Sequence, residues 1–189
     1  KYCPADAVHQ QLVLEVEPLS PPTLEEICEQ ASPTARIMIL DQLNDPHNVG
    51  AILRTCAVFG VDALIVTEHA SAAVTPTLAK SASGAMEFVP MITVTNLAQT
   101  MEYLKKNSFW FMGLDEDGTP LEKCSPKDFE GRLGIVMGGE HQGMRRLTRD
   151  HCDFIVRIPT TNEFSTLNVS NAAAVILYEA WRHKEENGG

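Results

Sequence analysis

Short apolar runs alternate with amphipathic stretches from about residue 35 towards the C-terminus. Residues 37–40 and 63–66 are apolar runs with the length and composition of buried strands. Between them, residues 47–59 repeat apolar side chains at the i, i+3, i+4, i+7 spacing of one helix face. The residues that carry this spacing are Val49, Ile52, Leu53 and Cys56. The pattern therefore predicts a strand, a helix and a second strand, with Gly60 ending the helix.

The same alternation continues along the chain. Further strands are expected at 89–94, 109–114, 134–137 and 154–158, and further helices at 75–82, 96–106, 142–148 and 167–185. Glu116-Asp-Gly118 predicts a turn. Strands and helices in alternation with short connections predict an α/β fold, with a mostly parallel sheet covered by helices on both faces. Ligands of such sheets bind beyond the carboxyl ends of the strands, so we expect the functional residues in the loops that follow strands.

Composition limits the chain to one good core. With 189 residues, 44% of them hydrophobic, a second full domain is not expected. Pro18, Pro21 and Pro22 exclude a continuous helix near the start, although a short one can begin after Pro22. The five cysteines are scattered and lack paired spacing, which favours reduced thiols in a cytosol-like compartment. The chain starts at Lys1 rather than at methionine, so we expect it to be the later part of a longer protein.

Charge neither supports nor excludes a nucleic-acid partner. The formal net charge is −10, whereas phosphate binding requires Lys and Arg. Four arginines nevertheless gather in one stretch, at Arg132, Arg145, Arg146 and Arg149. This stretch can equally form a solvated helix face.

The first loop of interest, Asp45-Pro-His-Asn-Val-Gly50, leads into the helix that carries Arg54. Gly50 and Arg54 are four residues apart, so we expect the guanidinium beside a gap opened by the glycine. A cationic fork there suits an anionic or hydroxyl-bearing substrate. A capped helix with an exposed arginine explains the same residues.

The second loop, Gly138-Gly-Glu-His-Gln-Gly143, is a glycine-rich turn with one carboxylate. It lacks the G-x-G-x-x-G pattern of dinucleotide-binding loops, and Met144-Arg145 stands where a P-loop has Lys-Ser/Thr. Glu140 can serve as a favourable charge at the start of the following helix or can orient a polar ligand. In the third loop, residues 159–170 concentrate hydroxyls and amides before an alanine-rich helix that favours self-association.

Taken together and in order, these loops resemble the SpoU/TrmH branch of the SPOUT methyltransferases. Asn48-Val-Gly-Ala-Ile-Leu-Arg54 resembles the first family motif and Ile135-Val-Met-Gly-Gly-Glu-His-Gln-Gly143 the second. Ile158-Pro together with Leu167-Asn-Val-Ser-Asn-Ala-Ala-Ala174 resembles the third. The match runs from about Val8 to Arg182. Within the family, residues 45–50 and 79–85 are most similar to the branch that methylates guanosine in large-subunit ribosomal RNA.

The resemblance implies an RNA ribose 2′-O-methyltransferase with a C-terminal trefoil knot. The methyl donor would be S-adenosylmethionine, and no metal is expected because a sulfonium is already activated. The resemblance also implies a homodimer, formed through the knot and the C-terminal helix, in a bacterial cytoplasm; a mitochondrial setting stays open. Many relatives carry a small upstream RNA-binding domain, so residues 1–32 are read as the linker from a missing domain and 33–189 as the catalytic domain.

The resemblance also implies roles for individual residues, carried over by position. The implied catalytic residues are Asn48, Arg54, Glu140 and Asn168. The implied cofactor-binding residues are Gly138, Gly139, Ile158, Thr166 and Leu167. Arg145 and Arg146 are implied to bind RNA. Arg54 either accepts the 2′-OH proton or binds the neighbouring phosphate and stabilises the developing alkoxide, since a guanidinium is a poor base.

Two positions depart from the family pattern. The family usually has serine where Thr166 stands and glycine near Asn162. These departures keep open a catalytically silent RNA-binding knot domain, and a transfer RNA substrate is a second alternative. A nucleotide-hydrolysing enzyme is disfavoured, because the P-loop pattern fails and no G-x-S-x-G motif is present.

Overall fold

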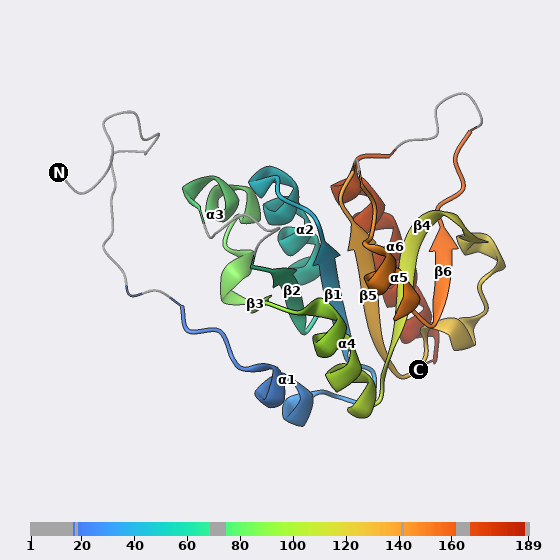
Figure 1. The fold of residues 1–189 in the computed structure, drawn as a ribbon, viewed down its shortest axis with the longest axis horizontal. Coiled ribbons are helices and arrows are strands. Elements are labelled where there is room, and N and C mark those ends of the chain that lie inside the picture. Colours follow the sequence, from blue (N-terminus) through green and yellow to red (C-terminus); the bar gives the residue numbers. More distant parts are fainter. Residues whose placement is uncertain (1–16, 18, 69–74, 141, 162–166, 188–189) are drawn as a thin grey trace.

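The protein folds around one six-stranded sheet, in which every paired strand is parallel to its neighbour (Figure 1). The computed structural model describes residues 17, 19–68, 75–140, 142–161 and 167–187. The strand order is β3-β2-β1-β5-β4-β6. The strands are β1 (Arg36–Asp41), β2 (Ala63–Thr67), β3 (Met91–Val94), β4 (Phe109–Pro120), β5 (Arg132–Gly138) and β6 (Phe154–Arg157). The expected α/β fold with a parallel sheet is confirmed.

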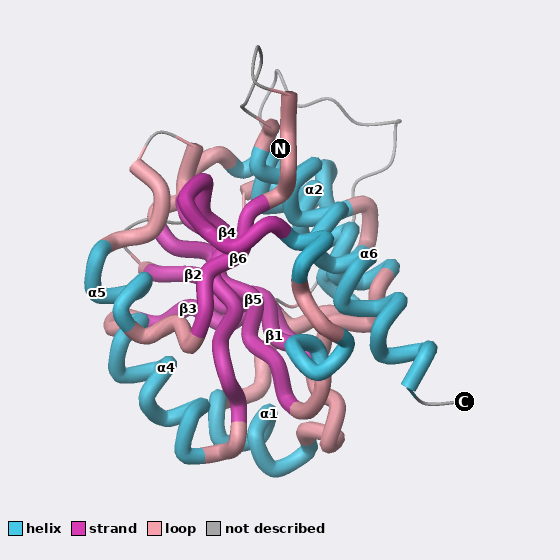
Figure 2. Tube along the Cα trace, turned by 90° about the vertical axis from the view of Figure 1, so that its right-hand side faces the viewer, coloured by secondary structure: helices cyan, strands magenta, loops and turns pink. Residues whose placement is uncertain are grey.

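Helices cover both faces of the sheet. They are α1 (Leu24–Gln30), α2 (Pro46–Val58), α3 (Pro76–Ala82), α4 (Leu97–Lys106), α5 (Arg146–Asp150) and α6 (Val169–Asn187). Figure 2 shows α2 and α6 on one side of the sheet, with α4 and α5 on the other. Short 3-10 helices lie at Ala85–Glu87, Leu121–Lys123 and Pro126–Phe129.

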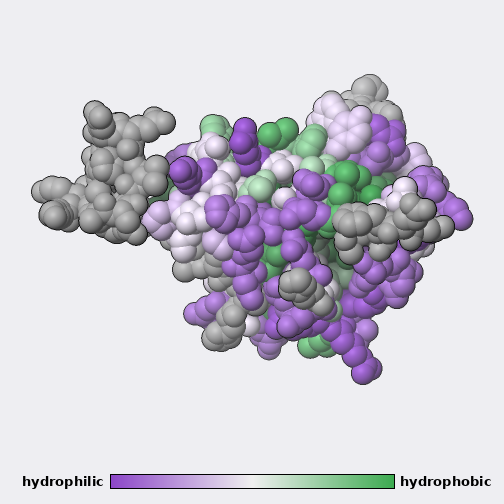
Figure 3. Space-filling model, turned by 90° about the horizontal axis from the view of Figure 1, so that it is seen from above, coloured by the Kyte–Doolittle hydropathy of each residue, from purple (hydrophilic) through white to green (hydrophobic). Residues whose placement is uncertain are grey.

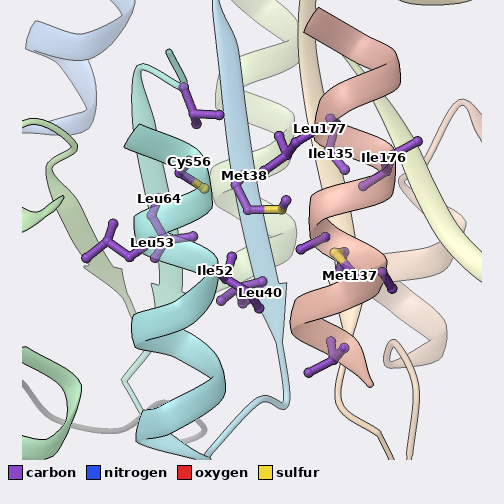
Figure 4. Packing of buried hydrophobic residues seen from close by; sticks show 14 of the residues in the cluster. Met38, Leu40, Ile52, Leu53, Cys56, Leu64, Ile135, Met137, Ile176 and Leu177 are labelled. Atoms are coloured by element: carbon purple, nitrogen blue, oxygen red, sulfur yellow. The ribbon is translucent and has the colours of Figure 1, made fainter. Parts of the chain in front are cut away.

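The larger of two cores lies between the sheet and the α2–α6 face. There Met38 and Leu40 of β1 meet Ile52 of α2 and Ile176 of α6, all of them buried (Figure 4). β1 is buried along its whole length, as expected for a central parallel strand with a layer on each side. The second core fills the opposite face, where Phe111 of β4 and Met101 of α4 are fully buried.

Two helices, α2 and α3, begin at a capping side chain followed by proline, a pattern that is visible in the sequence. The side chain of Asp45 accepts a hydrogen bond from the His47 amide and is followed by proline at the first position of α2. The hydroxyl of Thr75 accepts from the Leu78 amide and precedes Pro76 in the same way.

Two local predictions were wrong. The segment 116–118 does not form an independent turn but lies within β4, whose pairing with β6 shifts between Leu114 and Thr119. A Cβ on Gly118 would lie 2.4 Å from the Val156 backbone, so this glycine allows the two strands to approach. The helix expected at 142–148 begins only at Arg146, because Gly143 has a left-handed φ of 62° and its amide closes a turn onto the Gly139 carbonyl at 2.8 Å.

The packed structure extends into the stretch read as a linker. A capping box at Thr23 and Glu26 starts α1, and this helix buries Ile27 and Cys28 in the second core. Residues 1–16 and 18 lie outside the described residues. The predicted knot depends on the path of residues 162–166, which are also outside them, so the knot stays a prediction. Within the described residues, no helix is long and apolar enough to cross a membrane.

Candidate active site

A pocket of about 690 Å³ lies where three strands end at the same edge of the sheet. The register places Asp41 of β1 beside Gly138 of β5, and Leu114 of β4 beside Met137. The pocket is lined by residues 114–116 within β4, by the ends of β5 and β6 with the segments that follow them, and by the start of α6. Figure 3 looks onto this edge from above and shows apolar surface between hydrophilic residues. The position agrees with the expectation that ligands bind beyond the carboxyl ends of the strands.

Glu140 is the centre of a hydrogen-bond network that joins all three sequence motifs. Its Oε1 accepts from the side-chain amide of Asn48 at 3.1 Å and from that of Asn168 at 3.0 Å. The backbone amide of Val169 also points at Oε1, at 3.5 Å. The amide nitrogen of Asn168 in turn lies 3.2 Å from Oδ1 of Asn48. Three of the four expected catalytic residues are therefore in direct contact.

The charge of Glu140 lies near the starts of α2 and α6, not of the helix that follows it in sequence. Asn48 is in the first turn of α2, and Val169 is the first residue of α6. Exposed amides and the helix dipole make such positions favourable for a carboxylate. The sequence interpretation of Glu140 as a charge at the start of the following helix was wrong, because α5 begins six positions later, at Arg146. Among the described residues, Oε2 of Glu140 makes no hydrogen bond.

Asn168 has both of its functional atoms engaged. Its Oδ1 accepts from the backbone amide of Ser170 at 2.9 Å and from the Ser170 hydroxyl at 2.6 Å, as a helix cap does. Its nitrogen donates to Asn48 and Glu140. The same side chain thus starts α6 and fixes the Glu140 carboxylate, which predicts that even a conservative replacement disturbs both.

Most of the expected cofactor-binding residues line the pocket. Gly138 and Gly139 come from the end of β5, Ile158 follows β6, and Leu167 precedes α6. Thr166 and Asn162, the two departures from the family pattern, lie outside the described residues. A Cβ on Gly138 would lie 2.0 Å from the backbone of Gly143, and this wall of the pocket therefore has no room for a side chain at Gly138.

The expected gap beside Gly50 is not open. Gly50 is buried, and a Cβ there would lie 2.6 Å from Cβ of Ser81 and 2.7 Å from the Leu78 carbonyl oxygen, both on α3. The glycine therefore permits close packing of α2 on α3, and the prediction of a ligand gap was wrong because the covering helix is remote in sequence. Arg54 is exposed on α2 and makes no hydrogen bond or ion pair with the residues that the structure describes.

The arginines of the second motif differ in their surroundings. Arg145 binds the buried carboxylate of Asp41, whereas the side chain of Arg146 is 94% exposed. Arg149 donates to Asp115 and Asp117 of β4. The hydrogen bond to Asp117, followed by the charges of both carboxylates, raises the pKa of Arg149 above its ordinary value.

Comparison with known proteins identifies the family. The model of the SpoU rRNA Methylase family matches residues 35–178, which include all the site residues described above. The chain belongs to this family.

The similar proteins include named methyltransferases and solved structures. The chain is 43% identical over 183 residues to the 23S rRNA (guanosine-2′-O-)-methyltransferase RlmB of Pseudomonas putida, covering 95% of this chain and 73% of that protein. The crystal structure of the SpoU methyltransferase AviRb from Streptomyces viridochromogenes, in complex with its cofactor AdoMet, superposes with a TM-score of 0.80. It is 27% identical and covers 89% of this chain and 67% of its own. The A. aeolicus TrmH/SpoU tRNA modifying enzyme has a TM-score of 0.72 and 28% identity, over 87% of this chain and 82% of its own.

Several residues of this SpoU-family pocket were missed in the sequence. Arg157 and Thr160 line it beside Ile158, and Asp115 and Glu116 line it from within β4. Arg157 and Thr160 could have been suspected from their place around the Ile158-Pro motif. No local signal marked Asp115 or Glu116, because the strand was expected to end at residue 114 and residues 116–118 were expected to form a turn.

The donor set of the pocket suits an organic ligand. Among the described residues, no group of three or more His, Cys, Asp or Glu side chains is placed to hold a metal ion. A pocket of this volume, with apolar walls at Leu114, Met137 and Leu167 and a few polar groups, is typical of small-molecule sites.

Proposed function

We propose that this SpoU-family methylase transfers a methyl group from S-adenosylmethionine to the ribose 2′-OH of a guanosine in large-subunit ribosomal RNA. The observation that carries the proposal is the contact of Asn48 with Glu140 and Asn168, both of which line the pocket. These residues belong to the three motifs of the family and meet only in the folded chain. The likeness to the Pseudomonas putida rRNA guanosine methyltransferase supports ribosomal RNA as the substrate.

The residues of the pocket fit S-adenosylmethionine. Gly138, Gly139, Ile158 and Leu167 line one continuous cavity, which has the size that ligands of this class require. When bound, the cofactor supplies a methyl group on a sulfonium. Backbone groups of these four residues would hold it, and Thr166 would add its hydroxyl.

Positioning of the RNA is the main task of this chain's residues. An oriented attack supplies about 7–11 kcal/mol of a reaction barrier in favourable cases. Glu140, held by Asn48 and Asn168, keeps one oxygen for the incoming ligand. Arg54 accepts the 2′-OH proton or binds the neighbouring phosphate and stabilises the developing alkoxide. Its exposure and the lack of a partner among the described residues are compatible with either role.

Arg146 is the clearest candidate for contact with the RNA backbone. Its side chain is 94% exposed, and its only described ion pair, with Asp150, is long at 3.7 Å. Exposed pairs of this kind contribute about 0–1 kcal/mol, so the guanidinium can exchange Asp150 for a phosphate.

The bacterial relatives also favour the cytoplasm as the site of this reaction.

Binding and transfer together test this function. Calorimetric titration with S-adenosylhomocysteine is expected to show saturable binding of about one molecule per protomer. Incubation with labelled S-adenosylmethionine and a 23S rRNA transcript is expected to label one guanosine, which then resists alkaline cleavage at its 3′ side. Transfer RNA serves as the comparison substrate, and labelling of transfer RNA alone would overturn the ribosomal assignment. Binding of neither cofactor nor its product would favour the silent RNA-binding domain.

We further propose that two copies associate through an aromatic patch formed by Phe59, Val175, Tyr178 and Trp181. The three ring-bearing residues contact one another at centroid distances of 6.1–6.2 Å. Tyr178 and Trp181 nevertheless remain 47% and 41% exposed on α6. Exposed apolar patches of this kind mark association surfaces.

Sedimentation separates the dimer from the monomer. Trp181→Glu is expected to shift the protein towards the monomer, since a charge on the patch would be buried without a partner. Phe88→Glu is the matched control, because Phe88 is also an exposed aromatic residue, at 80%, but lies outside the patch. A Trp181→Glu protein that stays dimeric would exclude this surface.

A further inference from the structure

A fully buried carboxylate stands at the end of β1, next to the pocket but outside its lining. The side chain of Asp41 is 0% exposed. A buried charge requires compensation, and Asp41 finds all of its described partners in one residue. Its Oδ2 accepts from the backbone amide of Arg145 at 2.8 Å, and its Oδ1 accepts from Nε of the same residue at 2.8 Å. Nη2 of Arg145 also lies 2.8 Å from Oδ1 in an ion pair.

The residue after Asp41, Gln42, also contacts the segment that precedes Arg145. Gln42 has a left-handed backbone, with φ of 59°, and its side-chain amide donates to the Gly143 carbonyl at 3.1 Å. A Cβ on Gly139 would lie only 2.2 Å from the Gln42 carbonyl oxygen, so the backbones of the two residues are in contact. The end of β1 therefore contacts the loop at Gly139, Gly143 and Arg145.

This loop forms one wall of the pocket and carries Glu140. Gly138, Gly139, Glu140, Gln142, Gly143 and Met144 all line the cavity. The positions of the wall and of the Glu140 carboxylate thus depend on what holds the loop at its two ends. Its start is held by β5, and its end is held by the Asp41–Arg145 pair.

We propose that Asp41 and Arg145 are positioning residues for methyl transfer, which hold the described parts of the loop between β5 and α5, Gly138–Glu140 and Gln142–Arg145, in their cofactor-binding shape. This inference rests on the proposed function of the pocket. It also gives two adjacent arginines different roles: Arg145 positions the loop through its contact with Asp41, and Arg146 contacts the RNA. The side chain of Arg145 is 48% exposed, yet its backbone amide and guanidinium are both committed to one buried carboxylate.

Substitutions at Arg145 test the lock through cofactor affinity. Arg145→Met leaves Asp41 buried without its cation and is expected to weaken S-adenosylhomocysteine binding by about tenfold or more. Arg145→Lys keeps the charge but not the two-point fork, so it is expected to restore part of the affinity. In the double variant Asp41→Asn/Arg145→Met, the loss is expected to be less than the product of the two single losses, because the pair acts as a unit.

Lys105→Met is the matched control. Lys105 makes a 2.7 Å ion pair with Asp153 outside the pocket, and its loss is expected to leave cofactor affinity within twofold of the wild type. Hydrogen exchange adds a readout that needs no ligand: the Gly143 amide is expected to exchange faster in Arg145→Met than in Lys105→Met. Thermal unfolding of each variant shows which proteins are folded. If Asp41→Asn does not fold, the cofactor affinity of Arg145→Lys decides whether the pair positions the loop.

The salt dependence of RNA binding separates the two arginines. Loss of one phosphate contact reduces the slope of log affinity against log salt by about one. Arg146→Met is expected to show this reduction and Arg145→Met is not. A reduced slope in Arg145→Met, or cofactor affinity and Gly143 exchange equal to those of the wild type, would overturn the positioning role. If the wild type itself binds no S-adenosylhomocysteine, the proposed function fails, while Gly143 exchange still decides whether the pair locks the loop.

Discussion

Asn168 and Asn48 lie 120 positions apart in sequence, yet the side-chain nitrogen of Asn168 donates to Oδ1 of Asn48 at 3.2 Å. The contact ties the start of α6 to the first turn of α2. Both side chains also donate to Oε1 of Glu140, so three loops that follow three different strands are held as one unit. A polar network of this kind fixes geometry only when all members are present.

Replacement of Glu140 by glutamine is expected to lower the rate of methyl transfer by about 100-fold. The change removes the charge towards which Asn48, Asn168 and the Val169 amide are directed, and displacements near 1 Å can have effects of that size. Transfer to the 23S rRNA transcript under single-turnover conditions measures the loss. Glu122→Gln is the control, since Glu122 is exposed in the 3-10 helix Leu121–Lys123. A rate within twofold of the wild type would show that the charge is dispensable.

Arg54→Ala is expected to abolish transfer while cofactor binding persists. Proton transfer or alkoxide stabilisation by a positioned group contributes about 10²–10⁴-fold, and the rate should fall by a comparable factor. Because Arg54 is exposed and makes no described contact, the melting temperature should change little. Calorimetry with S-adenosylhomocysteine and a transfer assay on the same sample separate the two effects. Unchanged transfer would remove Arg54 from the chemistry.

Gly50→Ala is expected to destabilise the protein although alanine is the better helix former. The gain in helix propensity is about 1 kcal/mol, whereas overpacking typically costs about 1–3 kcal/mol. The new methyl would lie 2.6 Å from Cβ of Ser81. Urea unfolding measures the difference.

A second substitution identifies the contact that causes this loss. Ser81→Gly in the Gly50→Ala background should recover part of the stability, because it removes the nearest of the atoms that the methyl meets, while the Leu78 carbonyl oxygen remains. Ser83→Gly, at the exposed left-handed end of α3, should combine additively instead. Equal stability of Gly50→Ala and wild type would mean that α3 moves away at little cost.

Stability is expected to fall as pH rises from about 9 towards 12. Burial raises the pKa of the Cys152 thiol to about 12, and burial also raises the pKa of Cys56 above its ordinary value. Both thiols therefore bind their protons more tightly in the folded state, and the resulting stability is present below the unfolded pKa and is lost as pH rises. Urea unfolding from pH 8 to 11 measures this trend.

A variant isolates the contribution of one thiol. Cys152→Ala should show a smaller fall over the same pH range, because it has no proton to lose at that position. Native Cys152 should also react with iodoacetamide at pH 8 much more slowly than the unfolded chain does. Fast alkylation of the native protein at Cys152 would contradict this account.

Local patterns in the sequence were sufficient for most of the strands and helices. Runs such as 37–40 predict buried strands because parallel strands are covered on both faces, and the cap at Thr75 predicts the start of α3 because its chemistry is local. The motif residues Asn48, Glu140 and Asn168 were identified by resemblance, and the rule for parallel sheets placed their loops at one edge. Local patterns could not show that the three side chains share hydrogen bonds.

Tertiary structure alone decided what depends on a neighbour that is distant in sequence. Gly50 was read as a gap because α3, which fills it, is some 30 positions away, and residues 116–118 were read as a turn because Val156 was not known to lie against Gly118. Arg145 and Arg146 are adjacent and chemically identical in the sequence. Only the fold, by burying Asp41 beneath one of them and leaving the other in solvent, gives them different electrostatic surroundings, on which the different roles proposed for them rest.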